Sequence, residues 1–289
     1  MAFFPDRATF VQIGSLSIQW YAIFIVTGAI IAYLLSLRNF KKMHIDKEVL
    51  EDFFINALLV GIIGARIWYV IFSYNEIYAH RDWIDMFKIW EGGLAIQGGV
   101  IFATIYGVYY FKKHHVDIWR AADCIMPNLL VAQAIGRWGN FMNQEAHGTQ
   151  VDLSFLEGWH LPQFIIDGME INGRYYHPTF LYESVGNLIV FAIIVLLVRR
   201  FYHRHGTLFF SYFIGYSIVR FFVEALRTDS LMLGSLRMAQ VTSIACIIIG
   251  IGGLIYLHFK GEKVTFLATC GEEAVARGVK AGEIIKTIA

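Results

Sequence analysis

Charged residues are scarce in this chain of 289 residues: they make up 16% of it, whereas hydrophobic residues make up 57%. Soluble globular domains carry about 25% charged residues. The deficit excludes an ordinary water-soluble domain and indicates a protein whose main solvent is lipid. The formal net charge of +1 also lacks the basic excess of a nucleic-acid-binding surface, so we expect no nucleic-acid partner.

Cysteine is equally sparse. Cys124, Cys246 and Cys270 lie far apart, and the first two fall within apolar runs. This spacing excludes a disulfide framework and does not match the spacing of metal ligands. We therefore predict buried thiols that pack as small apolar side chains, and no metal site.

The N-terminal residues lack the basic segment that precedes the apolar core of a cleavable signal. The first apolar run, about residues 16–37, is also longer than such a core. We expect this run to be retained as a membrane-spanning helix.

Long apolar runs are abundant, and about 20 mostly apolar residues suffice for a helix to cross a bilayer. The sequence predicts an all-α polytopic membrane protein of about seven transmembrane helices, with a transmembrane domain at residues 1–260 and a tail at 261–289. Polar residues interrupt the second and fourth of these spans. The predicted spans cover residues 17–37, 50–73, 93–111, 121–141, 179–198, 207–226 and 237–259.

Basic residues alternate between the connections. The first, third and fifth loops and the tail hold most of the 24 lysines and arginines. The positive-inside rule assigns these segments to the cytoplasm, which predicts an outer N-terminus and a cytoplasmic C-terminus. The longest connection, residues 142–178, then lies outside, where we expect it to form a small external cap. In the tail we expect a short helix at residues 272–285.

Ionisable residues within the spans carry the strongest functional signal, because each costs about 2.5–3.5 kcal/mol to insert. Arg66, Arg137 and Arg220 fall in the outer halves of their spans. Guanidinium groups donate paired hydrogen bonds that suit phosphate. Three arginines at one depth, with few acids to neutralise them, predict the binding of an anionic lipid headgroup. Two polar stripes have helical spacing: Tyr216, Arg220, Glu224 and Arg227, and Gln133, Arg137, Asn140 and Gln144.

Each of these features also has a purely structural interpretation. Arg220 and Glu224 are four residues apart, so they could form an intrahelical ion pair that only stabilises the bundle. Gly98 and Gly99 could permit close helix packing or the close approach of a ligand. His177 could be a hydrogen-bonded polar residue or a catalyst. The sequence leaves these alternatives open.

Residues 136–148 form a distinctive string, Gly-Arg-Trp-Gly-Asn-Phe-Met-Asn-Gln-Glu-Ala-His-Gly. It closely resembles the signature G-R-x-G-N-F-x-N-x-E-x-x-G of the bacterial prolipoprotein diacylglyceryl transferase family. The resemblance covers roughly residues 15–260. Further segments occur in that family's order: 19–21, 64–67, 90–93, 97–99, 177–183, and Tyr216, Arg220, Glu224 and Arg227.

The resemblance implies an enzyme of the bacterial plasma membrane whose active site faces the outer leaflet. Such an enzyme transfers the diacylglyceryl group of phosphatidylglycerol to the lipobox cysteine in the signal peptide of a prelipoprotein. A thioether forms and glycerol phosphate leaves, which is the first step of lipoprotein maturation. The family needs no cofactor.

Arg137 and Arg220 are our candidates for a clamp on the departing phosphate, because charge-assisted hydrogen bonds strengthen as charge builds on that group. Glu145 and Glu224 would hold the arginines or polarise hydroxyl groups, and Asn140 would orient the headgroup glycerol. The other predicted substrate contacts are Tyr21, Arg66, Gln97, Gly98, Gly99, His177 and Tyr216.

Position 97 departs from the family pattern. Many members carry a histidine there that has been proposed as the general base, whereas Gln97 cannot accept a proton at physiological pH. Glu145, Glu224 and His147 are the alternatives. The phosphate clamp could also lower the pKa of the substrate thiol by the proximity of its positive charge.

Two other functions compete with catalysis. A transporter or channel for an anionic solute needs polar residues across the whole membrane, whereas the inner halves of most predicted spans are almost wholly apolar. A lipid-binding protein without catalysis is disfavoured only by the family resemblance.

Overall fold

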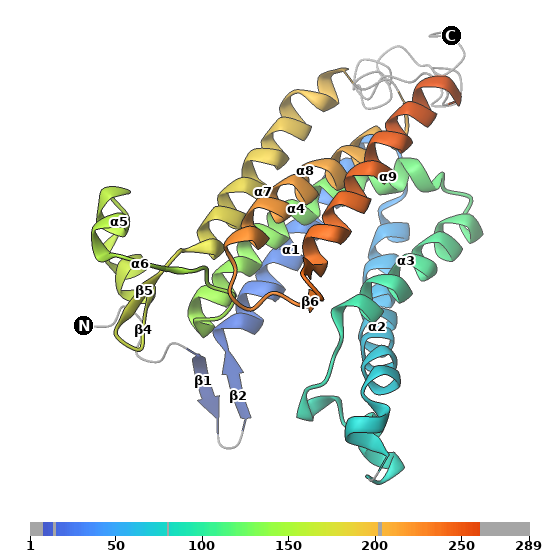
Figure 1. Ribbon diagram of the computed structural model, residues 1–289. Coiled ribbons are helices and arrows are strands. Elements are labelled where there is room, and N and C mark those ends of the chain that lie inside the picture. Colours follow the sequence, from blue (N-terminus) through green and yellow to red (C-terminus); the bar gives the residue numbers. More distant parts are fainter. Residues whose placement is uncertain (1–7, 14–15, 80, 202–203, 261–289) are drawn as a thin grey trace. The chain divides into compact units, whose positions relative to one another are not determined.

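The computed structural model describes residues 8–13, 16–79, 81–201 and 204–260 (Figure 1). The chain divides into two compact units. The first unit comprises the described residues up to Asn39 and from Ala122 onward, and the second comprises Phe40–Ala121. The helix predicted at residues 272–285 lies outside the described residues.

A long helix forms most of each of the seven stretches that the sequence predicts as spans. Five of them are long and apolar enough to cross a membrane, and the interrupted second span is among these five. The other two, α3 and α4, are helical but less apolar. The seven helices are α1 Trp20–Lys42, α2 Lys47–Phe72, α3 Ile96–Lys113, α4 Ile118–Asn143, α7 Thr179–Leu196, α8 Thr207–Leu226 and α9 Met238–Lys260.

The outward faces of these helices are apolar. On α1, Val26, Ile30 and Leu34 recur every four residues, and each is at least half exposed. A helix that faces water would place charged and polar side chains on such a stripe. The apolar stripe fits a helix whose outer surface contacts lipid.

Small residues and short polar contacts join the helices of the first unit. A Cβ atom on Gly28 of α1 would lie 2.9 Å from the backbone oxygen of Ala132 in α4, so the two backbones approach closely. The hydroxyl of Ser184 in α7 donates to the backbone oxygen of Ala134 in α4 at 2.9 Å. Helix α8 packs against α7 and also against α9 (Figure 1).

A buried acid fixes the start of α8. Asp123 of α4 is fully buried, and its carboxylate accepts hydrogen bonds from the backbone nitrogens of Gly206 at 2.6 Å and Phe209 at 2.8 Å. The first N–H groups of a helix have no partner within the helix and attract negative charge. Asp123 therefore caps α8 from a neighbouring helix. The short helix η4, Val198–Phe201, precedes this corner.

Residues 144–178 fold into a small insert between α4 and α7. Its three strands form an antiparallel sheet in the order β3-β5-β4. A buried cluster that includes Leu156, Ile165 and Met169 packs the insert against Phe141 and Phe180, which belong to the flanking helices. The elements are β3 Gln150–Val151, α5 Leu153–Gly158, α6 Gln163–Gly168, β4 Glu170–Ile171 and β5 Arg174–Tyr176.

Two short hairpins that the sequence did not predict flank helices of the first unit. β1 (Thr9–Ile13) pairs with β2 (Leu16–Gln19) directly before α1. β6 (Met232–Leu233) pairs with β7 (Leu236–Arg237) directly before α9.

The second unit is a helical pair, in which α2 and α3 pack together through glycines. A Cβ atom on Gly64 would lie 2.4 Å from the Phe102 side chain. The connection between the two helices contains three short helices: η1 Tyr74–Tyr78, η2 Trp83–Phe87 and η3 Ile89–Glu91. Gly92 and Gly93 have φ angles of 86° and 76°, which glycine adopts without strain, so α3 begins at Ile96, after the predicted start of its span.

Candidate active site

A buried carboxylate joins two arginines from neighbouring helices. Glu183 of α7 is 2% exposed and lies between Arg137 of α4 and Arg220 of α8. Its Oε1 is 2.8 Å from Nη2 of Arg137, and its Oε2 is 3.2 Å from Nη1 of Arg220. A carboxylate in an apolar environment must be paired, and here each oxygen faces a guanidinium group. The two arginines are thereby held side by side.

The ion pairs continue along α8. Nη2 of Arg220 lies 2.8 Å from Oε2 of the buried Glu224, so the intrahelical pair predicted from their spacing is present. The same oxygen is 3.9 Å from Nε of Arg227, and Nη2 of Arg227 lies 2.8 Å from Oδ2 of Asp229. Arg237 donates to the backbone oxygens of Glu224 and Arg227, which closes the C-terminal end of α8.

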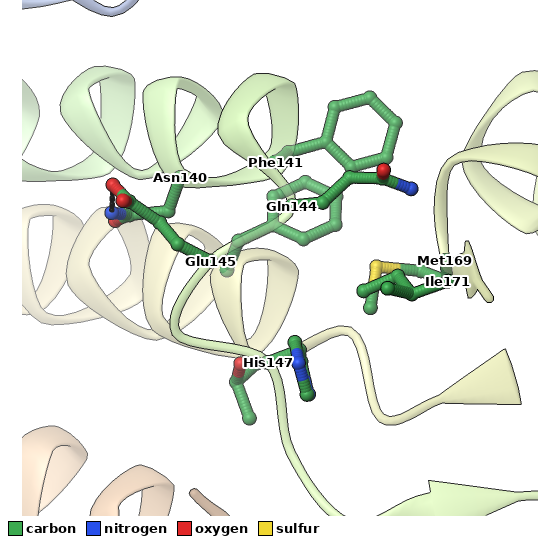
Figure 2. A pocket seen from close by; sticks show the side chains of 9 residues that line it. Asn140, Phe141, Gln144, Glu145, His147, Met169 and Ile171 are labelled. Carbon is green, nitrogen blue, oxygen red and sulfur yellow. Dashed lines mark hydrogen bonds between the residues drawn. The ribbon is translucent and has the colours of Figure 1, made fainter. Parts of the chain in front are cut away.

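On the other side, the contacts lead from Arg137 toward the insert. Nη1 of Arg137 donates to Oδ1 of Asn140 at 3.1 Å, and Nδ2 of Asn140 donates to Oε1 of Glu145 at 2.8 Å. Figure 2 shows the side chains of Asn140 and Glu145 meeting at the end of α4. Gln144 and Ala146 adopt φ angles of 53° and 57°, so the chain turns sharply on both sides of Glu145. Glu145 is exposed, unlike Glu183 and Glu224.

Two tyrosines flank this network. A Cβ atom on Gly139 would lie 2.5 Å from Cδ2 of Tyr21, so the glycine allows the tyrosine ring to rest on α4. Tyr216 of α8 lies beside Glu183, Arg137 and Arg220. Its ring stacks on that of Tyr212, with centroids 5.9 Å apart. Of the two tyrosines that the sequence assigned to the site, Tyr216 packs beside its charged side chains, and Tyr21 packs on α4 at Gly139.

A small pocket opens where α4 meets the insert (Figure 2). Asn140 and Glu145 form its polar side, and Phe141, Met169 and Ile171 form its apolar side. Since Asn140 also bonds to Arg137, the pocket is continuous with the ion-pair network.

His177 lies where the insert joins α7. Its Nδ1 is 3.2 Å from the hydroxyl of Tyr182, and its ring meets that of Phe155 edge-on at 4.8 Å. Burial lowers the pKa of His177, because the protonated ring loses hydration there. The backbone oxygen of His177 accepts from the nitrogen of Gly148 at 3.1 Å, which ties the end of the family string to the start of α7.

Arg66 belongs to the second unit and bonds only to backbone there, as far as the described contacts go. Its three guanidinium nitrogens donate to the carbonyl oxygens of Asp85, Met86, Gly92 and Gly93 at 2.7–3.0 Å. The side chain also lies near the rings of Tyr69 and Tyr78. Arg66 thus fixes the irregular segment before α3, and a direct substrate contact stays a prediction.

Gln97, Gly98 and Gly99 form the first turn of α3, also in the second unit. A Cβ atom on Gly98 would lie 2.2 Å from Cβ of Trp68, and one on Gly99 would lie 3.2 Å from the backbone oxygen of Gly61. Both glycines therefore serve close packing between α2 and α3. Gln97 is exposed on this helix, and the substrate contacts of all three residues stay predictions.

Comparison with known proteins supplies the family. The family model described as prolipoprotein diacylglyceryl transferase matches residues 8–256. The chain belongs to this family. A relative from Listeria innocua, named phosphatidylglycerol–prolipoprotein diacylglyceryl transferase, is 48% identical over 250 residues, which cover 86% of this chain and 89% of the relative. A relative of the same name from Bacillus cereus is 50% identical over 257 residues, covering 89% of this chain and 94% of the relative.

Membership in the prolipoprotein diacylglyceryl transferase family confirms the resemblance seen in the sequence. One expectation about the charges is wrong, however. The sequence suggested arginines with few acids to neutralise them, whereas Arg137, Arg220 and Arg227 each contact a carboxylate. Glu183 supplies the central one, and it was given no role because its partners come from two other helices.

The described residues of this family member fit chemistry carried by guanidinium and carboxylate groups. No three His, Cys, Asp or Glu side chains among them are placed to hold a metal ion. A guanidinium group has five N–H donors, and Arg137 contacts Asn140 through Nη1, Glu183 through Nη2, and also the side chain of Tyr216. Its Nε is buried and has no partner among the described residues, so Arg137 keeps a donor for a further acceptor.

Proposed function

We propose that this chain transfers the diacylglyceryl group of phosphatidylglycerol to the lipobox cysteine of prelipoproteins in the bacterial plasma membrane. The family membership supports it, since the relatives' names specify phosphatidylglycerol and a prolipoprotein. The single observation that carries the proposal within this chain is the Arg137–Glu183–Arg220 cluster, which includes Arg137 of the family string.

The proposed topology has seven spans, an outer N-terminus, a cytoplasmic tail and the insert as an external cap. Seven long helices and the alternation of basic residues between their connections support it. In this orientation Arg137 lies near the outer end of α4 and Arg220 in the outer half of α8. The active site would then face the outer leaflet, where phosphatidylglycerol and an exported cysteine can meet.

The chemistry is a displacement at a saturated carbon. The thiolate of the substrate cysteine attacks the glyceryl carbon next to the phosphate, a sulfur–carbon bond forms, and the carbon–oxygen bond breaks. The electron pair of that bond leaves with glycerol phosphate. Arg137 and Arg220 would neutralise the charge that builds on the leaving phosphate, and a low-dielectric site would strengthen this effect.

The remaining site residues take supporting roles in this proposal. Asn140 would orient the headgroup glycerol. Glu224 would hold Arg220, as their 2.8 Å contact supports. Glu145 is our candidate acceptor for the thiol proton, because it is exposed and its described hydrogen bond is to the neutral Asn140. Tyr21, His177 and Tyr216 would contact substrate in the first unit. Arg66, Gln97, Gly98 and Gly99 stay predicted substrate contacts of the second unit.

A direct assay tests the proposal. Purified protein is incubated with phosphatidylglycerol and a lipobox peptide that contains cysteine, and the peptide is analysed by mass spectrometry. We expect a diacylglyceryl adduct on the cysteine and an equal amount of glycerol phosphate. A peptide with serine in place of cysteine is the matched control. Absence of the adduct, or flux of an anionic solute in sealed vesicles instead, would refute the proposal in favour of binding or transport.

A further inference from the structure

Asn187 of α7 is a buried amide that the mechanism above does not use. The residue is fully buried, and neither its Oδ1 nor its Nδ2 has a hydrogen-bond partner among the described residues. Buried amides are almost always hydrogen-bonded, because losing hydration without a replacement is unfavourable. An amide left without a partner in this position suggests a partner that binds from outside the chain.

Asn187 lies about one helical turn from the charged cluster on α7. It follows Glu183 by four residues, so both side chains project from the same face of α7. That face meets α4, since Ser184 bonds to Ala134. Beside Ala134, Gln133 is the first member of the stripe that continues to Arg137.

Gln133 adds a second amide at this level. Its Nε2 is 2.9 Å from the hydroxyl of Tyr212, while its Oε1 is buried and has no partner among the described residues. Amide oxygen and nitrogen are assigned from their contacts, and a tyrosine hydroxyl can donate or accept. The Gln133 side chain can therefore turn over, keep its bond to Tyr212, and present N–H donors instead.

The two amides form a neutral layer, one helical turn of about 5.4 Å from the arginines. In the proposed orientation this layer lies on the membrane-interior side of Arg137 and Arg220. A phospholipid whose phosphate meets the arginines places its acyl ester groups on that same side, a few covalent bonds further along. Ester carbonyl oxygens only accept hydrogen bonds, and amide N–H groups donate them. The order of the groups in the lipid matches their order in the protein.

We propose that Asn187 donates a hydrogen bond to an ester carbonyl of the diacylglyceryl group, with Gln133 as the second donor. The inference rests on the proposed function and adds a specificity to it, namely the recognition of ester-linked lipid. Its ligand is uncharged, which suits a layer without ionised side chains. A phosphate or a free anion would instead be drawn to the neighbouring arginines.

The test compares phosphatidylglycerol with its ether-linked analogue, which has the same headgroup and chain lengths but no carbonyl groups. For the wild type we expect kcat/KM to be about two- to tenfold lower with the ether lipid, the value of one neutral hydrogen bond. Asn187→Leu should lower kcat/KM by a similar factor with the ester lipid and leave the ether lipid unaffected. Its Tm should be unchanged or higher, because an unpaired amide is replaced by an apolar group of similar size.

Controls separate this inference from the proposed function. Asn187→Ala repeats the measurement with a smaller side chain, in case leucine does not fit. Ser184→Ala on the same helix should change kcat/KM by the same factor with the ester lipid and with the ether lipid. If Asn187→Leu lowers kcat/KM equally with both lipids, or with neither, the carbonyl contact is refuted. The amide then binds water or serves packing only. If wild-type protein forms no adduct with phosphatidylglycerol itself, the proposed function fails independently of Asn187.

Discussion

Oε1 of Glu183 lies 2.8 Å from Nη2 of Arg137, and the two residues belong to different helices on either side of the insert. The acid is 2% exposed. Removing one partner of a buried ion pair strongly destabilises the folded protein, because the other charge stays buried without a counter-charge. The pair therefore ties the packing of α4 against α7 to the chemistry of the site.

Replacing Glu183 should weaken the packing of α4 against α7 and also reduce the rate of transfer. We expect Glu183→Gln to reduce stability by about 3 kcal/mol, since Arg137 and Arg220 would face each other without the charge between them. Thermal unfolding in detergent, together with the adduct assay, measures the two effects. Glu170→Gln on the exposed strand β4 is the control and should behave as wild type. An unchanged Tm for Glu183→Gln would contradict the bridging role.

Removing one arginine of the clamp should reduce transfer sharply, while Glu183 keeps its second partner, Arg220, and the protein stays folded. We expect Arg137→Ala to reduce the rate by about 10²–10³-fold, the range found when one donor to a developing charge is removed. Arg174→Ala, an exposed arginine on β5, is the matched control for charge. The adduct is quantified by mass spectrometry, and near-normal transfer by Arg137→Ala would refute the clamp.

Two glycines of α4 offer a paired test of the Tyr21 contact. A methyl group at Gly139 would lie 2.5 Å from the Tyr21 ring, whereas one at Gly136 would have nothing within 4 Å. We expect Gly139→Ala to displace Tyr21 and lower activity, while Gly136→Ala keeps activity and raises stability by up to about 1 kcal/mol through helix propensity. The measurements are the transfer activity and the Tm of the two variants. Equal activity of Gly139→Ala and Gly136→Ala would show that the position of Tyr21 does not depend on Gly139.

Arg66 should hold the segment before α3 in a fixed conformation. We expect Arg66→Ala to free the carbonyl groups of residues 85–93, and Arg66→Lys to restore them only in part, because an ammonium group lacks the planar fork. Hydrogen exchange of the backbone amides in residues 85–99 reports this directly. Arg81→Ala, an exposed arginine in the same connection, should leave exchange unchanged. Unaltered exchange in Arg66→Ala would instead favour a direct role with substrate.

His177 should make stability depend on pH. Its pKa is lowered by burial, so the folded protein binds its proton less readily than the unfolded chain does. Stability is therefore undiminished above the unfolded value of about 6.5 and falls as pH drops from there through the lowered pKa. Tm measured from pH 7.5 to 5 should decline less for His177→Gln than for wild type. Parallel declines would show that other groups dominate.

The sequence predicted the helices well, because a bilayer imposes a simple rule on length and apolarity. The range 207–226 is that of α8, and a long helix forms most of each of the seven predicted spans. The start of α3 was set too early, since the positive φ angles of Gly92 and Gly93 interrupt the helix. The two short hairpins were missed because β2 was counted with the first apolar run, and because β6 and β7 have only two residues each.

The site was predictable only within each helix. Spacing placed Arg220 and Glu224 on one face, and their ion pair follows from that. The position of Glu183 between arginines of two other helices depends on how the helices pack, which periodicity does not encode. The carbonyl partners of Arg66 could not be predicted for a similar reason, since they come from an irregular segment.

Arg237 is the last residue before α9, and it holds the backbone of Glu224 in the final turn of α8. The start of one helix and the acid beside Arg220 are thus mechanically joined. The bonds go to the backbone of Glu224 and Arg227 and not to the carboxylate itself. One side chain therefore connects the N-terminal end of α9 to the helical turn that carries Glu224.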